Sequence, residues 1–252
     1  MVLGFESFRE QFKGYENQYT IIGGTACDLL MSDAGEDFRA TKDIDIVLIV
    51  ESLTPEFGKK FWEYVIDGAY EHKNKSTGKP QFYRFSHPKK QGFPFMLELF
   101  SRRSDIIPLP EKANVSPLSL DEELSSLSAI LLDEDYYQFI RTGTISIDGV
   151  TILDAGHLIP LKAKAWLDLS AKKQSGMQHI DSKDIRKHKN DIYRLSTLLT
   201  AETRIEISDT IYADISDFVS AMENDTTDLK QIGIRNATKE ELTELILATY
   251  VK

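Results

Sequence analysis

The sequence has little cysteine, no long hydrophobic run and no excess of basic residues. The single cysteine, Cys27, cannot form a disulfide within the chain, which suits a reducing compartment such as the cytoplasm. No apolar stretch approaches the roughly 20 residues that a membrane-spanning helix needs, so no membrane association is expected. Thirty Lys and Arg against forty Asp and Glu give a formal net charge of −10, which disfavours a protein that coats nucleic acid non-specifically.

Several common motifs are also missing from the chain. There is no Gly-x-Ser-x-Gly, no Walker A motif and no Gly-x-Gly-x-x-Gly, so hydrolase, P-loop and Rossmann interpretations have no support. The histidines do not show zinc-binding spacing, either among themselves or with Cys27. The N-terminal segment carries Glu6 and Glu10 and has no long apolar core, so we do not expect a signal peptide.

Hydrophobic periodicity predicts an α+β chain with a mixed α/β half at residues 1–155 and a helical C-terminal half at residues 156–252. Asp148-Gly149 between two apolar segments predicts a hairpin of strands 144–147 and 150–153. The other predicted strands are 19–22, 44–50, 82–85 and 95–100. The predicted helices are 5–17, 25–31, 55–68, 120–132, 136–140, 157–172, 182–200, 207–223 and 238–250.

Two aspartates begin the predicted strand 44–50. Asp43 and Asp45 flank Ile44 and precede an apolar run that ends at Val50. Residues i and i+2 of a strand emerge on the same face, where two carboxylates can hold Mg²⁺. For the pair taken alone, a solvated strand edge is an equally good interpretation.

Gly23-Gly24-Thr25 stands between a predicted strand and a predicted helix. Glycine lets the backbone approach a ligand closely, and the start of a helix offers free N–H groups to a phosphate. The Thr25 hydroxyl could add a contact to a phosphate oxygen. The alternatives are a simple turn for the glycines and a helix N-cap for Thr25.

Glu98 interrupts the apolar strand 95–100. A charge in the middle of an apolar strand is costly to bury unless it has a partner, which a metal ion or another cation would supply. The alternative is an inward-pointing charge on an edge strand that blocks aggregation. Beside the aspartate pair, the metal-binding interpretation is favoured.

Three motifs, taken together, carry a resemblance to a known family. Gly-Gly-Thr, the segment Arg39-Ala-Thr41-Lys42-Asp43-Ile-Asp45 and the acid in strand 95–100 resemble the DNA polymerase β-like nucleotidyltransferase superfamily. The Arg-x-Thr-x-Asp-Ile-Asp wording is similar to its AbiEii/AbiGii toxin branch. Leu161-Lys162-Ala-Lys164-Ala165 is similar to that branch's Lys-x-x-Ala helix. Residues 187–195 are similar to its Arg-Asp-x-x-Asp segment, with Asp191 at the second acid but Lys187 and His188 in place of the Arg and the first acid.

The resemblance implies a nucleotidyltransferase fold, a mixed β-sheet flanked by helices, followed by a helical C-terminal domain. It implies transfer of a nucleotidyl group from an NTP to an acceptor hydroxyl on RNA, a protein or a small molecule, with Mg²⁺ or Mn²⁺ as cofactor. It also implies an antitoxin protein as a partner. The implied catalytic residues are Asp43, Asp45, Glu98 and Lys162, of which the three acids would bind the metal. The implied nucleotide-binding residues are Gly23, Gly24, Thr25, Arg39, Thr41 and Asp191.

Other interpretations of these residues stay open. The protein could be an NTP-binding regulator without catalysis, or an adenylyltransferase of the antibiotic-modifying kind. Lys162 could be a surface lysine on an amphipathic helix, and Arg39 could simply pair with a neighbouring acid. Asp191 could belong to a solvated helix face in which it pairs with Lys187 at i,i+4 spacing. The basic stretch 183–194 is compatible with RNA and equally with a solvated face.

Overall fold

The computed structural model describes residues 2–74, 82–102, 130–131, 133–176 and 180–252. Its contacts divide the chain into two compact units, Met1–Ser119 with Thr144–Leu153, and Leu120–Gly143 with Asp154–Lys252. The predicted α+β class is confirmed, because the described residues form a mixed sheet and many helices. The predicted helix 120–132 lies almost entirely outside the described residues. No helix in the described segments is long and apolar enough to cross a membrane.

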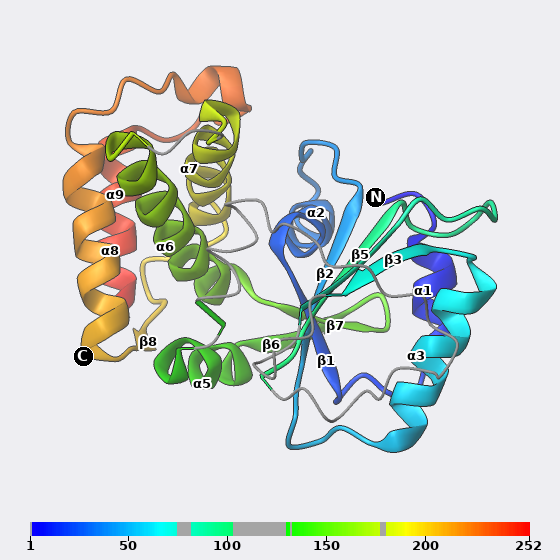
Figure 1. Ribbon diagram of the computed structural model, residues 1–252. Helices are drawn as coiled ribbons and strands as arrows, with labels where there is room; N and C mark the ends of the chain where they lie inside the picture. The colour runs from blue at the N-terminus through cyan, green and yellow to red at the C-terminus, as the bar shows by residue number, and fades with distance from the viewer. Residues whose placement is uncertain (1, 75–81, 103–129, 132, 177–179) are drawn as a thin grey trace. The chain divides into compact units, whose positions relative to one another are not determined.

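The first unit is built on a mixed sheet whose order, over the described strands, is β3-β4-β5-β2-β1-β7-β6 (Figure 1). At its centre β2 pairs antiparallel with β1 and parallel with β5, and β1 also pairs parallel with β7. The strands are β1 (Tyr19–Ile22), β2 (Asp43–Leu48), β3 (Glu71–Asn74), β4 (Phe82–Ser86), β5 (Met96–Phe100), β6 (Thr144–Ile147) and β7 (Val150–Leu153). The predicted hairpin is confirmed: β6 and β7 pair antiparallel, and its two turn residues, Asp148 and Gly149, have φ values of 50° and 77°.

Two helices, α1 (Phe5–Gln11) and α3 (Pro55–Asp67), lie side by side (Figure 1). Their aromatic side chains form a buried cluster with Phe12 and with Tyr19 of β1. The ring of Phe12, which follows α1 and is fully buried, lies 5.8 Å from that of Phe61 in α3 and 6.2 Å from that of Tyr19 in β1. α3 begins where the Thr54 side chain accepts a hydrogen bond from the Phe57 N–H, with proline as its first residue. This packing fixes the position of β1, which leads directly into another helix of this unit, α2 (Gly23–Asp33).

The second unit is helical. Its helices are α5 (Glu134–Thr142), α6 (Ala155–Gln174), α7 (Ser182–Ser196), α8 (Asp209–Met222) and α9 (Lys239–Thr249), with a 3₁₀ turn η1 (Leu229–Ile232) and a short parallel pair, β8 (Ile205–Glu206) and β9 (Tyr250–Val251). A side-chain oxygen accepts a first-turn N–H at the start of each of these α-helices; the capping residues are Asp133, Asp154, Asp181, Ser208 and Thr238. These caps explain where the helices begin.

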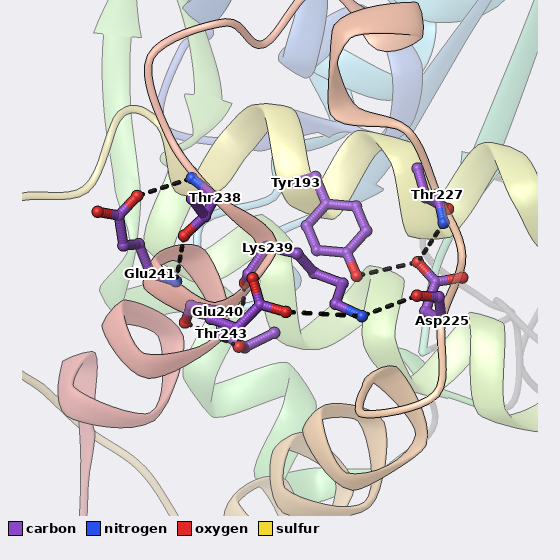
Figure 2. A network of polar contacts seen from close by, with 8 residues as sticks. All are labelled: Tyr193, Asp225, Thr227, Thr238, Lys239, Glu240, Glu241 and Thr243. Carbon is purple, nitrogen blue, oxygen red and sulfur yellow. Dashed lines mark hydrogen bonds and ion pairs between the residues drawn. The ribbon is translucent and has the colours of Figure 1, made fainter.

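One polar network joins α7, the segment after α8 and the start of α9 (Figure 2). The Asp225 carboxylate accepts hydrogen bonds from the Tyr193 hydroxyl at 3.1 Å and the Thr227 N–H at 3.3 Å. The backbone carbonyl of Asp225 accepts from the Lys239 ammonium at 2.7 Å. Next to it, Thr238 and Glu241 form a reciprocal capping box at the start of α9. A single aspartate thus fixes an irregular segment to two helices of this unit.

Candidate functional site

Strand register brings two of the three predicted acids together in the first unit. Asp45 of β2 lies opposite Glu98 of β5 in a parallel pair, and opposite Ile22 of β1 in an antiparallel pair. Asp43 stands two residues earlier on β2 and therefore emerges on the same face as Asp45. The predicted placement of both aspartates on one strand is thus what the structure has, and Glu98 is their neighbour on the next strand.

The start of α2 lies in close contact with Asp45. Gly23 has a φ of 67°, and a Cβ added there would lie 1.8 Å from Asp45 Oδ2. No other residue type fits this position without moving the carboxylate, and only glycine adopts this backbone conformation freely. The absence of a side chain at Gly23 is therefore a requirement of the close approach between the helix start and Asp45.

Further residues predicted to bind nucleotide gather at the same helix start. A Cβ on Gly24 would lie 2.8 Å from Thr41 Oγ1 and 3.4 Å from Arg39 Nη2. Thr25 is buried, and its hydroxyl donates a hydrogen bond to the Asp43 carbonyl at 2.5 Å. Thr25 is therefore not the N-cap of α2, a position that Ile22 occupies without any side-chain cap. The five predicted residues Gly23, Gly24, Thr25, Arg39 and Thr41 thus lie around one end of the α2–β2 pair.

The ionisation of Glu98 is strongly perturbed. Only 6% of the residue is exposed, and this burial raises the pKa of Glu98 from the ordinary 4.5 to about 9. The negative charge of Asp45 and a hydrogen bond with its carboxyl group add to the rise. The Arg84 guanidinium opposes this shift but does not cancel it. A buried carboxyl group in hydrogen-bond contact with a half-buried one, as Glu98 is with Asp45, shares a proton with it more readily than both carry a negative charge.

The donor set suits a magnesium ion in chemistry. Mg²⁺ prefers carboxylate oxygens, and Asp45 and Glu98 place two of them in contact, with Asp43 on the same strand face. A cation bound there would take the place of the shared proton. No group of three His, Cys, Asp or Glu side chains is already arranged around a metal position among the described residues. Binding of a metal ion by Asp43, Asp45 and Glu98 therefore stays a prediction, for which the carboxylate chemistry of these three residues is suited.

Lys162 and Asp191 belong to the second unit, where they bind each other. Lys162 Nζ lies 2.9 Å from Asp191 Oδ2, and the two side chains are 6% and 0% exposed. Arg194 Nη1 stands 3.7 Å from the other carboxylate oxygen of Asp191. Asp191 is thus not on a solvated helix face, and Lys162 is not a surface lysine. Their contact with nucleotide stays a prediction.

Other charged residues of α6 and α7 near this pair also have partners within the second unit. Lys164, two residues further along α6, pairs with Asp214 at 3.0 Å and with Asp168 at 3.7 Å. Lys187 stands 3.9 Å from Asp184 at i,i+3 spacing, and Asp191 has Lys162 as its partner. The charges of α6 and α7 are therefore matched both between packed helices and along each helix.

Arg84 is a site residue that sequence reasoning did not single out. Its Nε and Nη2 both lie 2.7 Å from Glu98 Oε1, across the antiparallel pair of β4 and β5. The expectation that a buried Glu98 needs a cation is met by this arginine within the protein. The signal that could have found it is a second charge inside an apolar strand, in Phe82-Tyr-Arg84-Phe85.

Comparisons with protein-family models, with curated proteins and with solved structures each found no match. We therefore infer function from the geometry and charges of the site.

A Gly23→Ala variant tests the close approach between α2 and Asp45. Gly35→Ala is the matched control, because Gly35 has a φ of 77° but nothing within 4 Å of an added Cβ. Left-handed strain alone should cost Gly35→Ala about 1–2 kcal/mol of unfolding free energy. Gly23→Ala should cost clearly more, since the Asp45 carboxylate must also move. Equal losses, measured by urea unfolding, would contradict the packing of Asp45 against the helix start.

A Glu98→Gln variant tests the raised pKa of Glu98. Because the folded protein holds this proton more tightly than the unfolded chain, its stabilisation is complete below a pH of about 4.5 and is lost as the pH rises toward about 9. The stability of the wild type relative to Glu98→Gln should therefore fall between pH 5 and pH 8.5, by on the order of 1 kcal/mol per pH unit. Glu10→Gln, on an exposed side chain, should show no such trend in urea unfolding.

A Lys162→Met variant separates a structural role from a nucleotide contact. Removing the ammonium leaves the buried Asp191 with a weaker partner, so the variant should lose about 3 kcal/mol or more of unfolding free energy. Lys162→Met with Asp191→Leu should recover much of this loss, because no buried charge remains. If thermal and urea unfolding instead show an unchanged stability while NTP binding is lost, the lysine acts on the nucleotide. Lys173→Met, on an exposed side chain at the end of the same helix, is the control.

Proposed function

We propose that the first unit binds a nucleoside triphosphate together with Mg²⁺ and transfers its nucleotidyl group to an acceptor hydroxyl. The observation that carries this proposal is the convergence of the α2 start, Asp45 and Glu98. Gly23 lies so close to Asp45 Oδ2 that a Cβ would overlap it, and Asp45 in turn contacts Glu98. A helix start that is suited to bind phosphate and two carboxyl groups that are suited to bind a metal ion are thus adjacent.

The start of α2 would hold the triphosphate. Its first turn has no side-chain cap, so its backbone N–H groups are available for phosphate oxygens, and the helix dipole favours negative charge there. Gly23 and Gly24, which lack side chains, let Asp45, Thr41 and Arg39 lie close to the backbone that would hold the phosphate. Arg39, whose guanidinium lies close to Gly24, would neutralise further phosphate charge.

The three acids would bind the metal ion that neutralises the triphosphate, and one of them would accept the proton of the acceptor hydroxyl. A divalent cation bound by Asp43, Asp45 and Glu98 would neutralise the triphosphate and lower the pKa of the acceptor hydroxyl. In the transfer, the acceptor oxygen forms a bond to the α-phosphorus, the bond from that phosphorus to the bridging oxygen breaks, and pyrophosphate leaves. If a single metal ion is used, Glu98 or Asp45 would accept the hydroxyl proton, once the bound cation has displaced the proton that the two carboxyl groups share.

The segment 39–45 resembles the motif of the AbiEii/AbiGii branch. This resemblance extends the proposal to a toxin whose activity an antitoxin inhibits. The mixed sheet with flanking helices is compatible with a nucleotidyltransferase fold, and the helical second unit is compatible with the C-terminal domain that the resemblance implies. The acceptor is an RNA, a protein or a small molecule, and an antibiotic-type adenylyltransferase is the small-molecule case.

The Arg84–Glu98 ion pair favours a second candidate function, a protein that binds NTP without transferring it. Both N–H groups of the guanidinium lie 2.7 Å from one oxygen of Glu98. If that arginine keeps the carboxylate, two acids remain for the metal, which is enough to bind an NTP complex but weakens the activation of an acceptor.

A transfer assay tests both candidates. Each α-³²P NTP is incubated with Mg²⁺, the protein and total cell extract, and RNA, protein and small-molecule fractions are counted separately. We expect label in one fraction and its loss, by a hundredfold or more on the scale of groups that stabilise transition-state charge, in Asp43→Ala with Asp45→Ala. Asp33→Asn, on the exposed end of α2, should transfer at the wild-type rate.

The two candidate functions are distinguished by whether the protein transfers label or only binds NTP. Equal label with the wild type and the Asp43/Asp45 variant would remove the metal-site assignment. No label with the wild type, but Mg²⁺-dependent NTP binding that the same variant abolishes, would favour the binding protein. Circular dichroism of the variant must show an unchanged fold for either conclusion.

A further inference from the structure

We infer that the Arg84 guanidinium takes the place of the metal ion at the predicted metal site. Arg84 pairs with Glu98 while the metal is absent and releases it when nucleotide and metal enter together. The inference rests on the proposed function and adds a regulation to it: the site takes its metal with the nucleotide rather than before it. Arg84 is a positioning residue in this scheme, since it acts through Glu98.

The contact between Arg84 and Glu98 is built into the sheet. The two residues face each other in the antiparallel register of β4 and β5, and Arg84 Nε and Nη2 both lie 2.7 Å from Glu98 Oε1. Two N–H groups directed at one carboxylate oxygen make a strong, charge-assisted contact. The register places Glu98 between Arg84 on one side and Asp45 on the other.

Arg84 and a divalent cation compete for the same carboxylate. Asp45 and Glu98 together supply at most two negative charges, one of which the guanidinium already balances. A divalent cation that binds beside Arg84 is repelled by it at short range, where charges interact strongly in a partly buried site. Metal binding to Glu98 therefore requires Arg84 to find another partner.

A bound triphosphate offers that partner. Its oxygens carry several negative charges, and a guanidinium binds phosphate with a geometry as favourable as its geometry with carboxylate. The Arg84 side chain is 20% exposed, whereas that of Glu98 is 7% exposed, so the arginine is the member of the pair with access to solvent and ligand. Nucleotide entry thus favours metal binding, and by reciprocity the metal favours nucleotide binding.

The test measures metal affinity without any nucleotide, by electron paramagnetic resonance titration of Mn²⁺. The wild type should bind Mn²⁺ weakly, and much more tightly with a non-hydrolysable α,β-methylene NTP. Arg84→Met should bind Mn²⁺ alone at least about tenfold more tightly than the wild type, because the competing charge is gone. Arg84→Lys should restore weak binding, and Lys90→Met, which removes an exposed cation from the same unit, should match the wild type.

The outcomes separate this inference from the proposed function. If the wild type gains Mn²⁺ affinity with nucleotide but Arg84→Met gains none without it, the inference is overturned and the proposed function stands. If the wild type with nucleotide binds no more Mn²⁺ than Asp45→Asn does, the metal site itself is wrong and both fall.

A second measurement avoids any dependence on the folding of Arg84→Met. In the wild type, the ¹⁵N resonance of the Arg84 Nε–H group reports its hydrogen bond to Glu98. We expect slow hydrogen exchange at this group without ligands, and a shifted signal with faster exchange when Mg²⁺ and the nucleotide analogue are added. An unchanged signal in the presence of bound nucleotide and Mg²⁺ would overturn the inference.

Discussion

The burial of Glu98 beside Asp45 is the constraint on which the site depends. Two acids placed side by side in the middle of a sheet need either a proton or a cation between them, and the raised pKa of Glu98 expresses that need. Arg84 on β4 satisfies part of it within the chain. Natural sheets keep such charges out of their centres unless there is a compensating gain. We regard binding of a cation and its anionic ligand as that gain.

The same constraint explains why the start of α2 has to be glycine. The Asp45 carboxylate occupies the space in which a Cβ of Gly23 would lie, so β2 and the helix start approach each other as closely as their backbones allow. The Thr25 hydroxyl, donated to the Asp43 carbonyl, fixes the helix start to the beginning of β2. A shift of one residue in the pairing of β2 would turn both aspartates to the other face of the sheet. The position of the acids therefore depends on register and on the helix start together.

The sequence predicted the elements whose patterns are local and missed what depends on pairing. β1, the β6–β7 hairpin and α3 lie within a residue of their predicted bounds, because apolar runs, Asp148-Gly149 and Pro55 mark them. The helix predicted at 5–17 ends at Gln11, before a turn that brings Gly14 to a φ of 89°. β3 is polar, without apolar alternation, and is a strand through its pairing with β4. Arg84 was missed, and the buried pairing of Lys162 with Asp191 was not predicted, for the same reason: these partners are set by strand register and helix packing, which no local pattern contains.

The two charge pairs that involve predicted catalytic residues differ in how readily they can exchange partners. Lys162 and Asp191 are 6% and 0% exposed, so if either left, the other charge would stay buried, with only the more distant Arg194 beside Asp191, at a cost of several kcal/mol. In the Arg84–Glu98 pair the guanidinium is 20% exposed, and the carboxylate has a second partner in Asp45 with which it shares a hydrogen bond. Breaking that contact leaves neither group without an alternative. Of the two pairs, the one on the sheet is therefore suited to change with a ligand, and the one between α6 and α7 is suited to hold the helices in place.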